Sequence, residues 1–328
     1  MLAIVQDRYG GVDTLDPRHV ARPEIGDNDV LIRVVAAGVD RGVWHLMTGT
    51  PFLTRLVFGL RRPGNPIPGL DVAGVVDSVG AAVTRFAEGD LVFGHGHGTY
   101  AEYARAHEDR LAAIPPRLDP IAAGVLAASG TTALQAVEDH GRVRPGDQVL
   151  VLGAAGGVGT YAVQIATALG GIVTGVASHA KLGLVQDLGA SRAFDYRTTD
   201  PLADANRYDV IIDTGGNRRL RDLRRALVPN GTLVIVDGEN GGRWIGGADR
   251  RIRAKTMSPF TRRCLTTFVA REDAGHLERL ADLVETGHVT PVVDRTFPLA
   301  RTADAIAHLA NGHTRGKTAL TINRLGHR

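Results

Sequence analysis

The chain has 328 residues, enough for about two domains with separate buried cores. Hydrophobic residues make up 44% of it and charged residues 22%, a composition that excludes a disordered protein. The formal net charge is +3, which does not by itself indicate a nucleic-acid partner. One cysteine, Cys264, excludes a disulfide framework and any zinc site with two thiolates. We expect a cytoplasmic protein in which Cys264 is a small core residue.

Residues 1 to about 122 are predicted to form an antiparallel, barrel-like module. Short β-branched runs at Val30–Ala36, Val72–Val79 and Leu91–Phe93 are separated by clusters of Gly, Pro and Asp. The first residues are typical of a strand rather than of a signal peptide. His95 and His97 lie in one glycine-rich cluster without an obvious third ligand, so we expect a loop there and no metal site.

Strands alternate with helices from about residue 123 to residue 268. The predicted strands are Gln148–Leu152, Ile172–Ala177, Ala193–Tyr196, Val210–Asp213 and Thr232–Asp237. The predicted helices are Val158–Leu169, Lys181–Leu188 and Arg218–Leu227. This alternation indicates a parallel, doubly wound sheet.

A stretch without Asp, Glu, Lys or Arg runs from Gln148 to Ala180 and is long enough for a membrane span. Seven glycines interrupt it between Val149 and Ala177. Because parallel strands covered on both faces are continuously apolar, we interpret the stretch as a buried strand, helix and strand, and we expect no membrane association.

The chain closes with further predicted elements at Cys264–Val269, His276–Glu285, Val292–Phe297, Thr302–Leu309 and Thr318–Ile322. We expect these last elements to return to the first module. One domain would then comprise residues 1–122 and 269–328, the other residues 123–268, with a cleft between them.

Residues 218–263 hold 12 Lys and Arg against 4 Asp and Glu. Leu220, Leu223 and Leu227 form an apolar stripe at helical spacing, which indicates that the arginines lie on a solvated helix face. We therefore expect no nucleic-acid partner.

The segment that follows the strand Gln148–Leu152 carries the strongest motif. Its G-x-G-x-x-G positions are Ala154, Gly156 and Gly159, so an alanine takes the first place. Gly156 would let the backbone approach a pyrophosphate, and Gly159 would let the helix pack closely on the strand. Free N–H groups at the helix start, near Gly157 and Val158, would face the phosphates. A kinase-type P-loop is excluded because no Lys-Ser/Thr pair follows the glycines.

The end of the second strand of this domain distinguishes between cofactors. A site for NAD usually has Asp or Glu there to bind the ribose 2′-hydroxyl. This chain offers Ser178, His179 and Lys181, followed later by Tyr196 and Arg197. A hydroxyl and cations suit a 2′-phosphate, so the sequence favours NADPH over NADH. The alternative is a solvated helix start with Ser178 as its N-cap.

Eight stretches in this order carry a resemblance to a known family: AIVQDRYGG, AAGVDRGVWHLMTG, PGLDVAGVVDSVG, RFAEGDLVFG, GTYAEYA, ASGTTALQAV, LGASRAFDYR and TRGKTAL. Together with the AAGGVG turn, they resemble the zinc-independent, quinone oxidoreductase branch of the medium-chain dehydrogenase/reductases nearly end to end. The resemblance implies a GroES-like β-barrel catalytic domain, a Rossmann domain that binds NADPH, and a homodimer that pairs through the Rossmann sheets.

The resemblance also implies a set of site residues. The pyrophosphate would contact Ala155, Gly156, Gly157 and Val158, and the adenosine side would contact Ser178, Lys181 and Tyr196. Further cofactor contacts would come from Asp213, Gly215, Val236, Asp237 and Gly238 at the strand ends, and from Thr131 and Arg315. Asp40, Trp44 and His45 would lie near the nicotinamide and the substrate.

Two departures from the zinc-dependent members bear on the chemistry. Those members carry Cys near the position of Asp40 and Gly-His-Glu where this chain has Gly69-Leu70-Asp71. Within the quinone branch an Asn is common at position 40. We therefore expect no metal site. Without zinc, the substrate itself must be electron-poor, as quinones and α,β-unsaturated carbonyl compounds are.

The source of the proton stays open in the sequence. Asp40 or His45 would act as an acid–base group, or both would only shape the pocket while water supplies the proton. Two alternative functions also stay open: a zinc-free NAD(P)-dependent alcohol or ketone dehydrogenase, and a non-catalytic NADPH-binding sensor or interaction protein.

Overall fold

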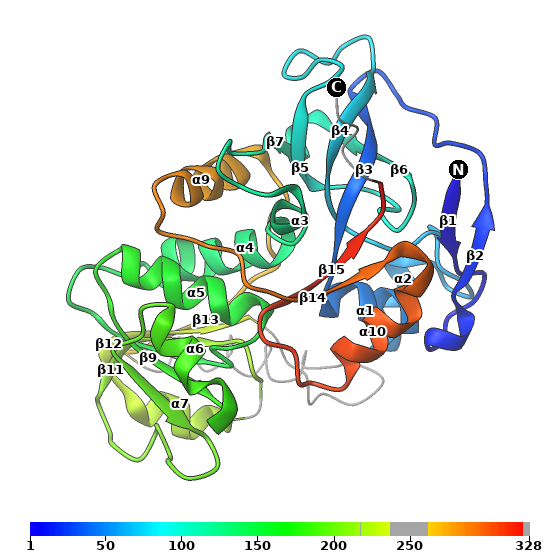
Figure 1. Ribbon diagram of the computed structural model, residues 1–328. Helices are drawn as coiled ribbons and strands as arrows, with labels where there is room; N and C mark the ends of the chain where they lie inside the picture. Colours follow the sequence, from blue (N-terminus) through cyan, green and yellow to red (C-terminus); the bar gives the residue numbers. More distant parts are fainter. Residues whose placement is uncertain (217, 237–261, 324–328) are drawn as a thin grey trace. The chain divides into compact units, whose positions relative to one another are not determined.

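A computed structural model describes residues 1–216, 218–236 and 262–323 (Figure 1). The chain forms two compact units. Unit 1 comprises Met1–Thr131 and Glu272–Arg328, and unit 2 comprises Thr132–Arg271. The chain therefore leaves the first unit, builds the second and returns.

Unit 1 contains a seven-stranded sheet in the order β14-β15-β3-β4-β5-β7, with β6 also paired to β3. Its strands are β3 (Asp29–Val39), β4 (Asp71–Val79), β5 (Leu91–His95), β6 (Tyr103–His107), β7 (Leu111–Ala113), β14 (Val293–Pro298) and β15 (Lys317–Thr321). Neighbouring strands are antiparallel except β14 and β15. A small separate sheet joins β1 (Leu2–Val5) and β2 (Asp16–His19).

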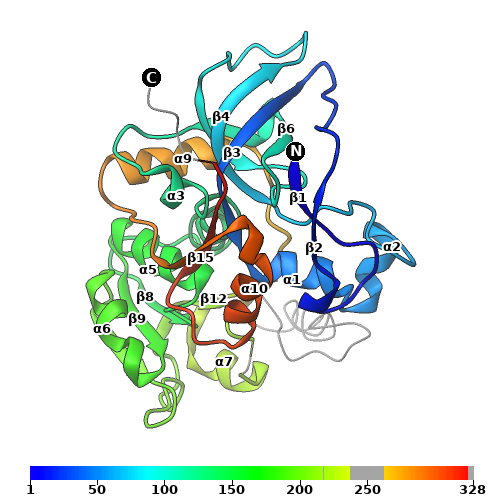
Figure 2. The same cartoon turned by 45° about the vertical axis from the view of Figure 1, so that its right-hand side comes forward.

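The return of the chain end to the first module is confirmed by the pairing of β15 with β3. The two strands lie side by side (Figure 1 and Figure 2), with Thr318 opposite Val39 and Leu320 opposite Ala37 in the register. Side chains from both ends of the chain share one core, in which Ile32, Val72 and Phe297 are buried. Removal of this apolar surface from water holds the two chain segments together.

The α-helices that lie wholly within the described part of unit 1 are α1 (Arg41–Thr48), α2 (Arg55–Phe58), α3 (Pro120–Ala123), α9 (Ala274–Glu285) and α10 (Thr302–Ala310). Helix α1 buries Val43 and Met47, which are four residues apart and so lie on one face. It begins after Asp40 and ends at Gly49, whose φ of 60° is the left-handed conformation common at helix ends.

Unit 2 contains a six-stranded parallel sheet in the order β10-β9-β8-β11-β12-β13. Its strands are β8 (Gln148–Leu152), β9 (Ile172–Ala177), β10 (Arg192–Asp195), β11 (Tyr208–Asp213), β12 (Leu227–Ile235) and β13 (Cys264–Thr267). Among the described residues of this unit, the helices include α5 (Gly157–Ala168), α6 (Leu182–Asp187) and α7 (Leu220–Ala226), and α4 (Ala127–Leu134) leads in from unit 1. The predicted doubly wound sheet is thereby confirmed.

The strand order places the switch point of this sheet between β8 and β11. The chain proceeds from β8 outward through β9 to β10, and then returns to β11 on the other side of β8. Sheets of this kind bind ligands beyond the carboxyl ends of their strands at the switch point.

The charge-free stretch folds as β8, α5 and β9, as predicted. Helix α5 is buried on all sides from Gly159 to Ala166, which explains its lack of charge. No helix among the described residues is long and apolar enough to cross a membrane.

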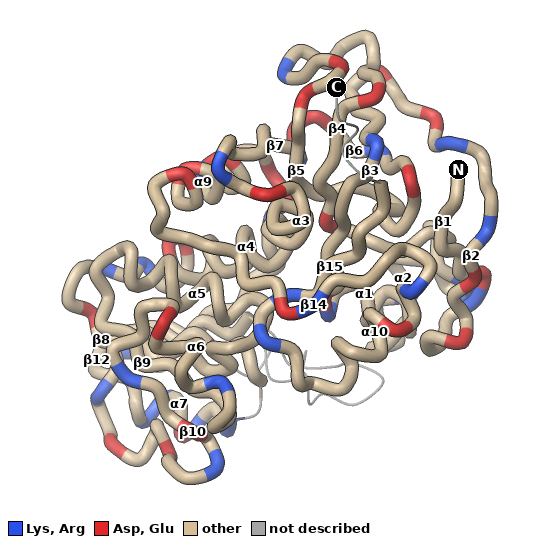
Figure 3. Tube along the Cα trace, viewed as in Figure 1, with Lys and Arg blue, Asp and Glu red and all other residues tan. Residues whose placement is uncertain are grey.

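Two expectations about unit 2 fare differently. The apolar stripe is confirmed, because Leu223 and Leu227 are fully buried and Leu220 is partly buried; Lys and Arg are frequent around α7 and β10 (Figure 3). The prediction that Cys264 is a core residue is wrong, because its side chain is exposed. β13 is the last of the described strands in the sheet order, and its alternation turns Leu265 inward and Cys264 outward.

Candidate functional site

The turn after β8 depends on glycines and on a hydrogen bond between backbone groups. Gly153 has a φ of 77°, and the N–H of Gly156 donates to the carbonyl oxygen of Gly153 at 2.9 Å. A Cβ atom on Gly159 would lie 2.1 Å from the same carbonyl oxygen. Gly153 and Gly159 are therefore required by the turn itself. The predicted G-x-G-x-x-G positions, Ala154, Gly156 and Gly159, do not include Gly153, although Gly153 has the left-handed conformation.

Helix α5 starts from this turn with its N–H groups available to an anion. Gly156 is the N-cap, no side chain caps the helix there, and the first turn holds no acidic residue. The first N–H groups of a helix have no partner within the helix, and the helix dipole favours negative charge beside them. The predicted pyrophosphate residues Ala155, Gly156, Gly157 and Val158 thus form a suitable cradle for a diphosphate.

The loop after β11 lies directly beside this turn at the switch point. Thr214 donates its hydroxyl to the carbonyl oxygen of Leu152 at 2.7 Å, and Asp213 pairs with Leu152 in the sheet. The buried Asp213 carboxylate accepts hydrogen bonds from the N–H groups of Gly215 and Gly216, at 3.2 and 3.0 Å. The Asp213 side chain therefore shapes the loop that presents Gly215.

The segment after β12 is only partly described. The N–H of Val236 donates to the carbonyl oxygen of Asp213 at 3.0 Å, which places Val236 at the same edge of the sheet. The predicted residues Asp237 and Gly238 lie outside the described residues.

The residues predicted to contact the 2′-phosphate lie just after the carboxyl ends of β9 and β10. Because β9 and β10 are parallel neighbours, Ser178 and Tyr196 follow them side by side, and the N–H of Tyr196 donates to the carbonyl oxygen of Ala177 at 3.2 Å. Ser178 occupies the N-cap position before His179–Lys181, but its side chain makes no capping hydrogen bond. The nearby Asp195 carboxylate accepts from the N–H of Arg197.

Thr131 and Arg315, the other predicted cofactor residues, belong to unit 1. Thr131 is fully buried, and its hydroxyl donates to the carbonyl oxygen of Ala127 at 2.8 Å. Arg315 is exposed in the turn before β15.

Helix α1 carries the predicted catalytic residues. One carboxylate oxygen of Asp40 accepts from the N–H of Val43 at 3.2 Å, so Asp40 is the N-cap of the helix. Trp44 is half-buried against the core of unit 1. Nδ1 of His45 lies 2.9 Å from the carbonyl oxygen of Thr50. A carbonyl only accepts, so Nδ1 carries the hydrogen, and Nε2 of the neutral ring is an acceptor.

A buried ionic cluster lies next to Asp40 in unit 1. Nζ of Lys317 donates to Oγ of Ser129 at 2.8 Å and lies 3.4 Å from Oδ2 of Asp71 and 3.8 Å from Oδ2 of Asp40. Oδ1 of Asp71 accepts from the N–H of Ala128 at 2.7 Å. Burial raises the pKa of Asp71, and the neighbouring Lys317 ammonium opposes that rise.

We define this group, Lys317, Asp71, Ser129 and Asp40, as the Lys317 cluster. Sequence reasoning did not bring these residues together. Lys317 and Asp71 each begin a mostly buried strand, KTALT and DVAGVVDSV, and a charge in that place was the available signal.

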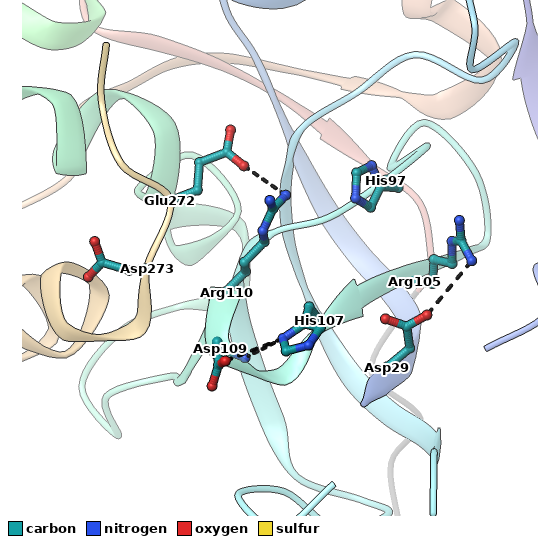
Figure 4. Close-up of a pocket in the computed structure, with 8 residues that line it drawn as sticks. All are labelled: Asp29, His97, Arg105, His107, Asp109, Arg110, Glu272 and Asp273. Atoms are coloured by element: carbon teal, nitrogen blue, oxygen red, sulfur yellow. Dashed lines mark hydrogen bonds and ion pairs between the residues drawn. The ribbon is translucent and has the colours of Figure 1, made fainter. Parts of the chain in front are cut away.

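The two histidines of the glycine-rich cluster differ from each other. His95 is the last residue of β5 rather than part of a loop; it is 4% exposed and pairs with Asp71 in the sheet. His97 lines a polar cavity of about 450 Å³ (Figure 4). Burial lowers the pKa of His97, and Arg110 and Arg105 lower it further.

The charges around this cavity compensate one another. Arg110 pairs with Glu272 at 3.0 Å, and Arg105 pairs with Asp29 at 3.7 Å (Figure 4). Within the described parts of the chain, no three His, Cys, Asp or Glu side chains are grouped so that they could hold a metal ion.

Comparison with known proteins matches both ends of the chain to one superfamily. Residues 26–116 match the alcohol dehydrogenase GroES-like domain, and residues 188–320 match the zinc-binding dehydrogenase family. The NADPH-dependent alkenal/one oxidoreductase of Arabidopsis thaliana is 33% identical, over 98% of this chain and 79% of that protein. The quinone oxidoreductase of Homo sapiens is 32% identical, over 95% of this chain and 94% of that protein.

Solved structures agree with these relatives. The quinone oxidoreductase from Coxiella burnetii superposes with a TM-score of 0.86 at 29% identity and covers 98% of this chain and 99% of its own. A mycobacterial protein solved in complex with NADPH superposes with a TM-score of 0.82 at 25% identity, over 98% of this chain and 100% of its own. With its GroES-like unit, its Rossmann-like parallel sheet and relatives of this identity over nearly its whole length, the chain belongs to the quinone oxidoreductase branch of the medium-chain dehydrogenase/reductases.

Proposed function

We propose that the protein is an NADPH-dependent oxidoreductase that reduces quinones or α,β-unsaturated carbonyl compounds by hydride transfer without zinc. The observation that carries the proposal is the turn between β8 and α5 at the switch point, with an uncapped helix start free of acidic residues. The names of the relatives, alkenal/one oxidoreductase and quinone oxidoreductase, support the substrate class.

The residues at the carboxyl edge of the sheet suit NADPH. The N–H groups of Gly157 and Val158 would hold the pyrophosphate, and Ser178 and Lys181 would hold the 2′-phosphate. No carboxylate stands at the end of β9 to bind a free 2′-hydroxyl. When bound, NADPH supplies the hydride.

In the proposed reaction, Trp44 and His45 lie on the substrate side, and water supplies the proton to the reduced substrate. Both oxygens of Asp40 are engaged, one by the N–H of Val43 and the other by the charge of Lys317. With Nδ1 directed at the carbonyl oxygen of Thr50, Nε2 of His45 is the ring nitrogen left to contact a water molecule.

Zinc independence rests on what occupies the space beside Asp40 and Asp71. The Lys317 ammonium lies within 3.8 Å of both carboxylates and already supplies the positive charge there. An electron-poor substrate then has to stabilise the developing negative charge, with help from hydrogen bonds.

The test is oxidation of NADPH, followed by the nicotinamide absorbance, with quinones, enones, aldehydes and ketones as acceptors and a chelator present. We expect turnover with a quinone or an enone that the chelator does not reduce, and slower turnover with NADH. Turnover with simple ketones alone would favour the zinc-free alcohol or ketone dehydrogenase. Tight NADPH binding without any oxidation would favour the non-catalytic NADPH-binding protein.

The proposal includes a homodimer, which we expect from the resemblance alone. Among the described strands, β13 is the last in the order of the unit 2 sheet, and a strand at that place can pair with a second copy. Light scattering coupled to size-exclusion chromatography measures the mass directly.

A further inference from the structure

The Lys317 cluster joins four separate stretches of unit 1 through buried polar groups. Lys317 begins β15, Asp71 begins β4, Ser129 lies in α4, and Asp40 stands between β3 and α1. The Lys317 side chain is 1% exposed and that of Asp71 is 0% exposed. An ammonium group has three hydrogens to donate, and three oxygen-bearing side chains surround this one.

Lys317 and Asp71 are held firmly in place. The Asp71 carboxylate accepts from the N–H of Ala128 at 2.7 Å, and its Oδ2 packs so closely on Gly38 that a Cβ atom there would lie 2.5 Å away. Lys317 is fixed by its own strand and by Ser129 at 2.8 Å. The ammonium is thus a rigid point of charge rather than a mobile one.

Asp40 connects this point of charge to α1. Its Oδ1 caps the helix through Val43, while its Oδ2 is buried without a hydrogen-bond partner among the described residues. The Lys317 ammonium, 3.8 Å away, is the positive charge that compensates Oδ2. The cap of α1 is therefore oriented from its other side by Lys317.

We propose that Lys317 is a positioning residue: through Asp40 it sets the start of α1, and with it Trp44 and His45 on the proposed substrate side. The inference rests on the proposed function, because it assigns a role in turnover to a residue that touches neither substrate nor cofactor. Apolar side chains in place of both members of a buried ion pair would serve folding alone about as well as the pair does. A directional restraint on Asp40 needs the charge.

The test compares Lys317→Met, Asp40→Asn and the double variant in the NADPH oxidation assay. Asn also caps helices well, so Asp40→Asn removes the charge and keeps the cap. We expect each single variant to lower kcat by at least about tenfold, with KM for NADPH changed less than about threefold. The double variant should be no worse than either single variant, because both remove the same interaction.

Asp294→Asn is the matched control. Asp294 pairs with His308 at 2.7 Å between β14 and α10 of the same unit, so the control also removes one charge from a partly buried pair. It should lower stability and leave kcat within about twofold of the wild-type value. Losses of kcat in the cluster variants that merely follow stability, as in the control, would overturn the proposal.

Hydrogen–deuterium exchange supplies a readout that needs no turnover. We expect amides of Trp44–Thr48 to exchange at least about tenfold faster in Asp40→Asn and in Lys317→Met, while α10 stays protected. Unchanged exchange in α1 would overturn the positioning role. If none of the acceptors leads to NADPH oxidation by the wild-type protein, the proposed function fails. The exchange measurement still decides whether Lys317 sets the start of α1. If Lys317→Met does not fold, Asp40→Asn carries both measurements.

Discussion

The two candidate functional regions of this protein differ in composition: one is built from backbone groups and the other from side chains. At the carboxyl edge of the unit 2 sheet, four glycines and the first N–H groups of α5 make a candidate phosphate cradle from backbone within seven consecutive residues, Gly153–Gly159. In unit 1, the Lys317 cluster is made from four side chains that are up to 277 positions apart, from Asp40 to Lys317. Substitutions should therefore fail by steric conflict in the first region and by unpaired charge in the second.

The largest effect is expected from Lys317→Met, which leaves two buried carboxylates without their counter-charge. Breaking a buried pair in this way should lower the free energy of unfolding by about 3–5 kcal/mol. The double variant Lys317→Met/Asp71→Leu removes one of those carboxylates as well, and should recover most of the loss. Urea unfolding of both variants measures the difference. A double variant less stable than the single one would contradict the account of the cluster.

The corresponding substitution in the backbone-built region is Gly159→Ala. Its Cβ atom would meet the Gly153 carbonyl oxygen at 2.1 Å, and we expect a loss of about 2–3 kcal/mol in the free energy of unfolding. Gly156→Ala is the matched variant, because its Cβ atom would lie 3.2 Å from the same oxygen. It should cost less than about 1 kcal/mol in stability, and it should weaken NADPH binding because the added methyl group blocks the approach of the pyrophosphate. Equal stability losses in both variants would contradict the claim that Gly159 is sterically required and Gly156 is not.

Lys181→Glu tests the side chains that surround the backbone cradle. Placing a negative charge beside the 2′-phosphate should raise the Kd for NADPH about 10- to 100-fold and that for NADH by less than about threefold. Arg192→Glu is the control, since it makes the same charge change at the amino end of β10, where Arg192 pairs with Thr174. Calorimetric titration of both variants with both cofactors gives the four constants. Equal losses for NADPH and NADH would remove Lys181 from the 2′-phosphate site.

At Glu108, backbone N–H groups stabilise the charge of a side chain, so this residue has features of both regions. It accepts from the N–H groups of Thr84 and Arg85 at 3.0 Å each, and the bond from Thr84 in particular lowers its pKa below the ordinary value of 4.5. A depressed pKa contributes stability above the ordinary value, and the contribution is lost as the pH falls through the folded-state pKa.

We expect Glu108→Gln to lower the free energy of unfolding by about 1–2 kcal/mol at pH 7. The difference from wild type should shrink below about pH 4, where the wild-type carboxylate takes up a proton. Chemical unfolding between pH 3 and pH 7 measures it. A difference that is constant over this range would show that the charge of Glu108 is not what the two N–H groups stabilise.

The sequence predicts most of unit 2 because its information is local. The strands β8 and β9 and the start of α5 follow from apolar runs and adjacent glycines, and Ser178 and Tyr196 meet because parallel strands end at one edge. Cys264 was misplaced because composition does not reveal which strand lies at the edge of a sheet.

The Lys317 cluster could not be predicted in the same way. Lys317 meets Asp71 and Asp40 only because β15 returns from the end of the chain to pair with β3. Each residue by itself is an ordinary charged residue next to an apolar run. The sequence raised the question of what Asp40 does, and the tertiary pairing of strands supplies the partner that explains it.

The most direct test of the central claim is a titration of the wild-type protein with NADPH and with NADH in the presence of a chelator. If the carboxyl edge of β8, β9 and β10 is a site for a dinucleotide with a 2′-phosphate, NADPH should bind at least about tenfold more tightly than NADH. Equal affinity for the two cofactors, or no binding of either, would contradict the account.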